Sequence, residues 1–167
     1  GSPSTDHSSI LSVSPIGGLT LNISNATGND YGTTAGEGYA YSAVYGLKEI
    51  ATLGAGQMKN ADDSEEFLMN ATANVGAIGV AFEKHTATTA ADVDTDTTTM
   101  GATYTVGAMM VGVETMKTES AGTVSSDEIT FGAQYTLAPG AVAFIENTAD
   151  DKTASEKTTA MGIAIKF

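Results

Sequence analysis

Few residues of this 167-residue chain have both a type and a spacing suited to chemistry. Asp92, Asp94 and Asp96 alternate within the segment 92–96, which reads Asp-Val-Asp-Thr-Asp. Alternate carboxylates can direct hard oxygen ligands at one Ca²⁺ ion, as in the first half of a calcium loop. The second half is missing, because Thr97 stands where the sharp turn needs glycine and Thr103 where a bidentate glutamate would close the site. We therefore expect an acidic loop in solvent, with weak divalent-cation binding at most.

Histidine and serine chemistry has little support in the sequence. The two histidines, His7 and His85, are far apart, which disfavours a shared metal site, and we expect each ring to be solvated. There is no cysteine and no Gly-x-Ser-x-Gly segment, so a hydrolase at a membrane surface would have to depend on His85. We predict that the chain is not an enzyme, has no catalytic residues and needs no cofactor.

Charge excludes one class of partner. Seven lysines and no arginine oppose 20 acidic residues, giving a net charge of −13. Phosphate contacts need clustered basic residues, so nucleic acid is an improbable partner. No apolar run reaches the length of a membrane-spanning helix. The first residues lack a basic start followed by an apolar segment, so we expect that an export signal was removed or was never present.

The chain repeats a unit of strand, glycine turn and strand about every 30 residues, with turns expected at Gly46, Gly76, Gly107 and Gly140. Longer polar segments separate these units and predict loops at the opposite end of an antiparallel meander, at residues 25–36, 60–64, 86–96, 120–127 and 148–155. We expect a flexible segment over residues 1–15 and one β domain over residues 16–167. Ten strands are predicted, at roughly 16–25, 37–46, 48–59, 66–75, 77–86, 98–106, 108–118, 127–137, 140–147 and 156–167.

Apolar and polar residues alternate along most of these strands. Ile129, Phe131, Ile163 and Phe167 belong to the apolar set, whereas the polar set is mainly Thr, Gly, Ser, Ala and Asn. Exposed strand faces of soluble proteins usually carry more charge. The pattern therefore favours an all-β, antiparallel, up-and-down transmembrane β-barrel whose apolar face meets lipid. The alternative is a secreted or surface-assembled structural or adhesin subunit, in which the same faces form a buried core.

The segments 105–113 and 130–141 and the closing Gly-Ile-Ala-Ile-Lys-Phe of residues 162–167 resemble the last strands of bacterial general diffusion porins of the alphaproteobacterial type. The segment 16–24 resembles a strand nearer the middle of such porins. The resemblance implies a bacterial outer-membrane protein, passive diffusion of small hydrophilic solutes, a homotrimer, and recognition of Phe167 by the barrel-assembly machinery. Such porins have sixteen strands and about twice this length, so the chain corresponds to their C-terminal part or to a ten-stranded relative.

Charged residues on the polar side of the strands are the candidate pore residues. Glu83, Glu114, Glu128 and Glu156 fall near the long-loop end, and Lys166 falls at the opposite end. In a water-filled lumen these glutamates would favour cations. They could equally be solvated charges near strand ends.

Overall fold

The computed structural model describes residues 7–28, 36–48, 50–60, 62–151 and 157–166. These residues form eleven antiparallel strands and no helix. In chain order they are β1 (His7–Ile16), β2 (Leu19–Gly28), β3 (Gly36–Leu47), β4 (Ala51–Lys59), β5 (Glu65–Val75), β6 (Ile78–Thr88), β7 (Asp94–Val106), β8 (Met109–Ser120), β9 (Thr123–Ala138), β10 (Ala141–Asp150) and β11 (Lys157–Ile165).

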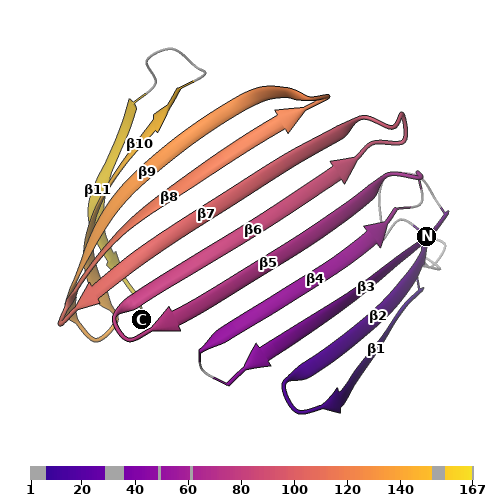
Figure 1. The fold of residues 1–167 in the computed structure, drawn as a ribbon, viewed down its shortest axis with the longest axis horizontal. Coiled ribbons are helices and arrows are strands. Elements are labelled where there is room, and N and C mark those ends of the chain that lie inside the picture. The colour runs from indigo at the N-terminus through magenta and orange to yellow at the C-terminus, as the bar shows by residue number, and fades with distance from the viewer. Residues whose placement is uncertain (1–6, 29–35, 49, 61, 152–156, 167) are drawn as a thin grey trace, which may run out of the picture.

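The strands form a single sheet in which each strand pairs with its neighbour in sequence, from β1 to β11 (Figure 1). Figure 1 shows most of the strands running diagonally to the long axis of the molecule, and the sheet curling at its β10–β11 end. β1 and β11 occupy the two edges and do not pair with each other over the described residues. The predicted antiparallel up-and-down architecture is confirmed. No described helix is long and apolar enough to cross a membrane.

The strand count differs from the prediction of ten, because His7–Ile16 forms an additional strand within the segment expected to be flexible. This strand was not predicted because its hydrophobic pattern is weak, with serines at 8, 9, 12 and 14. The segment nevertheless pairs with β2 from His7–Thr27 to Val13–Leu21. Backbone pairing with a neighbour therefore supplies the strand that the side-chain pattern does not indicate.

Four tight turns with a left-handed glycine join strands at the short-turn end. Gly18, Gly76, Gly107 and Gly140 have φ between 57° and 83°, a conformation that glycine adopts without steric cost. Three of them were predicted as turns. Gly46 was predicted too, but it stays inside β3, and the chain turns after Leu47 with Lys48 at φ 51°.

The loops at the other end are shorter than the polar segments suggested. A long loop was predicted at residues 120–127, but Ala121 and Gly122 form a two-residue turn, both with positive φ. Such a turn matches the twist of the strands it joins. Likewise, the predicted loop over 86–96 reduces to residues 89–93, because β6 and β7 continue their pairing to Thr88–Asp94. Threonine-rich segments are good strand formers, and this explains the difference.

Within the described residues, no second layer covers either face of the sheet. Among the described residues no side chain is fully buried, and large apolar side chains are exposed along the whole sheet. Phe131 is 55% exposed and Ile163 is 64% exposed. A water-soluble domain of this size would bury such side chains. The described sheet therefore requires an apolar environment on the face that carries Phe131 and Ile163.

The β1–β2 turn offers a matched test of this backbone geometry. A Cβ atom on Gly18 would lie 2.4 Å from the carbonyl oxygen of Gly46, and its φ is 83°. Gly17, directly before it, has no neighbour within 4 Å of such an atom and no positive φ. We predict that Gly18→Ala lowers the free energy of unfolding in detergent by about 1–3 kcal/mol, whereas Gly17→Ala changes it by less than about 0.5 kcal/mol. Urea denaturation followed by circular dichroism measures both, and equal effects would contradict the turn geometry.

Candidate functional site: the polar face of the sheet

The register separates the side chains of the sheet into two faces. Residues directly opposite each other in an antiparallel pair share a face, so each face can be followed from strand to strand. One such row runs Asn70, Glu83, Thr99, Met116, Glu128 and Asp150. We call the side that carries this row the polar face, and the opposite side, which carries Phe131 and Ile163, the apolar face.

Small hydroxyl and amide side chains line much of the polar face. They hydrogen-bond across strands: Asn22 donates to Ser42 at 3.1 Å, and the hydroxyls of Thr130 and Thr148 lie 2.9 Å apart. Thr97 and Thr118 make a similar contact at 3.3 Å. Short polar side chains cover the backbone without filling the space above it, so this face suits contact with water.

Six acidic residues of the described strands lie on the polar face, while Glu65, Asp94, Asp96, Glu119 and Asp127 lie on the apolar face. The predicted pore residues Glu83, Glu114 and Glu128 share the polar face, and the register adds three that the sequence analysis did not single out: Glu66, Glu146 and Asp150. Lys166, directly after β11, continues the alternation of that strand onto the same side, at the short-turn end. Glu156 lies outside the described residues, as does Phe167.

Four strand lysines lie on the other face, the apolar one: Lys59, Lys84, Lys117 and Lys157. The first three are paired with carboxylates near the long-loop end. Lys59 contacts Asp63 at 3.0 Å and Glu65 at 3.6 Å, Lys84 contacts Asp96 at 3.6 Å, and Lys117 contacts Glu119 at 2.8 Å. Three of these four lysines are therefore neutralised by carboxylates on the apolar face, and none of the four offsets the carboxylates of the polar face.

The three aspartates of the predicted calcium loop do not converge. Asp94 accepts a hydrogen bond from Thr88 at 2.7 Å, and Asp96 accepts one from Thr86 and pairs with Lys84. Asp92 lies in the turn before β7 with φ 56°. Over the described ranges, no group of three His, Asp or Glu side chains is arranged to hold a metal ion. The pairing of β6 with β7 directs these carboxylates to threonine and lysine instead.

The loop before β5 has its own local electrostatics. The Ser64 hydroxyl donates to Asp62 at 2.6 Å and the Ser64 backbone N–H donates to the same oxygen at 3.1 Å. These two hydrogen bonds stabilise the charged carboxylate and lower the pKa of Asp62 below its ordinary value. The turn therefore stays negatively charged at neutral pH.

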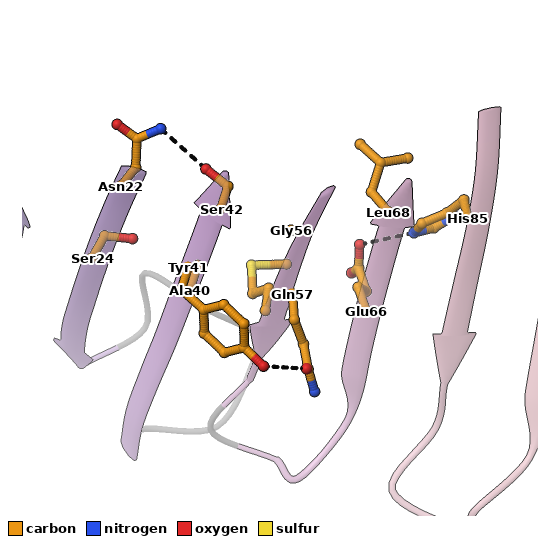
Figure 2. A pocket seen from close by; sticks show the side chains of 11 residues that line it. Asn22, Ser24, Ala40, Tyr41, Ser42, Gly56, Gln57, Glu66, Leu68 and His85 are labelled. Carbon is orange, nitrogen blue, oxygen red and sulfur yellow. Dashed lines mark hydrogen bonds and ion pairs between the residues drawn. The ribbon is translucent and has the colours of Figure 1, made fainter. Parts of the chain in front are cut away.

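Two of the hollows that indent the polar face bear on its function. The larger, of about 670 Å³, includes Glu114, Glu146 and Thr130 in its lining. The smaller, of about 280 Å³, is lined by residues of β2–β6, among them Gly56, Glu66 and His85 (Figure 2). Figure 2 shows the His85 ring and the Glu66 carboxylate meeting across β5 and β6, with Nε2 and Oε2 3.2 Å apart. His85 was predicted to be solvated, and its partner was missed.

A sheet of eleven inclined up-and-down strands, apolar on one face and polar on the other, defines the class of transmembrane β-barrel proteins. The sequence profile of the Gram-negative porins matches residues 2–155. The chain belongs to this family, which places it in the bacterial outer membrane, as the resemblance implied. No curated protein sequence matches it.

Solved porin structures share this fold. A porin refined at 1.8 Å resolution superimposes with a TM-score of 0.76 at 20% identity, over 95% of this chain and 60% of that one. Two engineered variants of the Rhodopseudomonas blastica porin give TM-scores of 0.69 and 0.71 at 16% and 17% identity, over 97% of this chain and 55% of theirs. The chain thus spans little more than half the length of these porins.

Adjacent residues of β7 test which face meets water. Thr99 lies on the polar face and Met100, 53% exposed, on the apolar face. The chain has no cysteine, so single-cysteine variants give a clean readout. In lipid vesicles we predict that Thr99→Cys reacts with a water-soluble maleimide at least about tenfold faster than Met100→Cys, because the thiolate forms in water. A bilayer-embedded quencher should show the reverse order, and equal labelling would contradict the assignment of faces.

Proposed function

We propose that this chain forms part of the wall of a water-filled outer-membrane channel through which small hydrophilic solutes diffuse passively, with cations favoured. The separation of charge between the two faces of the sheet supports this proposal. The polar face carries Glu66, Glu83, Glu114, Glu128, Glu146 and Asp150 on its strands, whereas the lysines of β4, β6, β8 and β11 lie on the opposite face.

The mechanism needs no reacting group. Carboxylates along a water-filled passage lower the electrostatic energy of a cation and raise that of an anion, so they change the relative permeability without a binding step. Glu83, Glu114 and Glu128 belong to β6, β8 and β9, and Glu114 contributes to the larger hollow. Glu156 and Lys166 complete the proposed set of pore-lining charges.

The proposal includes three partners. The lipid bilayer contacts the apolar face, a homotrimer is the expected assembly, and the barrel-assembly machinery recognises Phe167. Family membership supports these partners, and the run of exposed apolar side chains at Met161, Ile163 and Ile165 supports the first. Weak divalent-cation binding at the acidic segment 92–96 remains a prediction. An alternative hydrolase function depending on His85 has no support from a catalytic arrangement in the described residues, where the ring contacts Glu66.

Neighbouring acids on β9 provide the test of selectivity. Glu128 lies on the polar face and Asp127 on the apolar face, so Glu128→Gln and Asp127→Asn each remove one charge from opposite sides of one strand. In planar bilayers under a KCl gradient, we predict that Glu128→Gln lowers the cation-to-anion permeability ratio roughly twofold, the effect of one partly screened charge about 10 Å from the ion. Asp127→Asn should leave the reversal potential unchanged. A ratio that responds equally to both, or to neither, would refute the lumen assignment of this face.

Dependence on detergent separates the channel from the adhesin alternative. A lipid-facing surface bearing side chains such as Phe131 and Tyr135, both more than half exposed, must aggregate when detergent is removed. We predict monodisperse particles in detergent and loss of at least about nine-tenths of the protein on dilution below the critical micelle concentration. Size-exclusion chromatography with light scattering measures this. A monodisperse, detergent-free protein would support the alternative with a buried core.

A further inference from the structure

The smaller hollow on the polar face combines features that a simple solvated wall would lack. Its floor is the backbone at Gly56, and a Cβ there would lie 3.0 Å from Ser42 Cβ and 3.2 Å from the Tyr41 carbonyl oxygen. A side chain at this position would therefore crowd Ser42 and the Tyr41 backbone, whereas glycine leaves the floor of the hollow open. Met58 and Leu68 give the hollow an apolar wall, although they lie on the face that is otherwise mainly polar.

A carboxylate stands beside this apolar wall. Glu66 lies next to Leu68 along the same face of β5, and both line the hollow (Figure 2). An ionised carboxylate only accepts hydrogen bonds, so His85 Nε2 must carry the proton in its 3.2 Å contact with Glu66 Oε2. That contact orients the carboxylate. Within the described part of the chain no lysine pairs with Glu66, so it keeps its capacity for another cation.

The opposite wall is polar and already internally hydrogen-bonded. Asn22 accepts from Ser12 at 2.6 Å and donates to Ser42 at 3.1 Å. A ligand on this side therefore meets satisfied groups and gains little from adding hydroxyls of its own. The hollow thus offers one negative group, one apolar wall and one neutral polar wall.

We propose that this hollow binds small organic ammonium ions, with the ammonium group on Glu66 and the alkyl group against Met58 and Leu68. The proposal deepens the proposed function, because it names a solute class that would pause at this position of the channel wall. Among the residues that line the hollow, a bare metal ion would find one carboxylate and no second acidic ligand, whereas a sugar would leave the apolar wall unused. An alkylammonium ion satisfies the carboxylate and the apolar wall at once.

The probe is n-butylammonium chloride, titrated into the protein refolded in detergent micelles. Methyl NMR signals of Met58 and Leu68 report occupation of the apolar wall, and the His85 ring signals report changes at Glu66. We expect all three to shift together and to saturate, with a dissociation constant on the order of millimolar, as suits a ligand of so few atoms. Potassium chloride at equal ionic strength should give no saturable shift of the methyl signals.

Substitutions separate the contribution of the carboxylate to binding from that of the apolar wall. Glu66→Gln keeps the size of the side chain and removes its charge, and we expect about tenfold weaker butylammonium binding. Leu68→Asn should weaken binding about fivefold through loss of apolar contact. Glu128→Gln removes a charge from the same face outside this hollow and should leave the dissociation constant within about twofold. If Leu68→Asn does not fold, Ala40→Leu, which narrows the hollow, serves in its place.

Each result decides between a site and a general attraction. Saturable methyl shifts lost in Glu66→Gln and kept in Glu128→Gln support the site. Shifts that potassium reproduces, that Glu128→Gln weakens as much as Glu66→Gln, or that never saturate would overturn it. The readout requires no ion conduction, so a protein that binds butylammonium but does not conduct would refute the proposed function alone. A conducting protein without saturable binding would refute this site alone.

Discussion

The arrangement of this sheet depends on strand register. Side chains alternate with a period of two, so a slip by one residue between two strands would move an entire set of side chains to the opposite face. The register shifts occur between Val13 and Ile16, Thr118 and Glu119, and Ala141 and Val142, each close to a strand end. The central parts of all ten strand pairs remain in register. The two faces therefore stay separate across all eleven strands.

Separation of charge follows from this constraint. Glu128 and Asp127 are adjacent in sequence but belong to different environments, because the register places one beside Met116 and the other beside Lys117. Lysines on the apolar face carry long aliphatic stems that lie along apolar surface while their ammonium groups reach carboxylates near the strand ends. Glutamates on the polar face need no such partner if they meet water. The same alternation that keeps apolar groups together thus gives the polar face its net negative charge.

Much of the fold could be predicted from the sequence because tight turns fix register locally. The turn at Gly76 sets the pairing of Val75 with Ile78, and counting outward residue by residue then reaches Leu68 opposite His85. The proximity of Glu66 to His85 could therefore have been predicted from the sequence by counting from this turn. The membership of Glu83, Glu114 and Glu128 in one face likewise followed from alternation alone.

Other features depend on interactions that pattern does not encode. β1 lacks a strong hydrophobic alternation and is held by its ladder with β2. At the long-loop end, polar residues such as Thr86 and Asp96 resemble loop residues in composition, yet they continue the β6–β7 ladder and hydrogen-bond to each other across it. Composition cannot distinguish a polar strand from a polar loop there, because the deciding factor is the partner strand.

The hollow at Gly56 shows how such a wall acquires local chemistry without a dedicated loop. Most positions on the polar face carry short side chains, so a larger apolar side chain there protrudes above its neighbours and forms the wall of a hollow. Met58 and Leu68 form such a wall beside Gly56, where a Cβ atom would displace its neighbours. Since Glu66 is the acidic residue in the lining of this hollow, a negative charge lies beside an apolar wall at one point of the sheet. A flat wall of threonine and glutamate would attract cations in general, whereas this point distinguishes among them by their apolar parts.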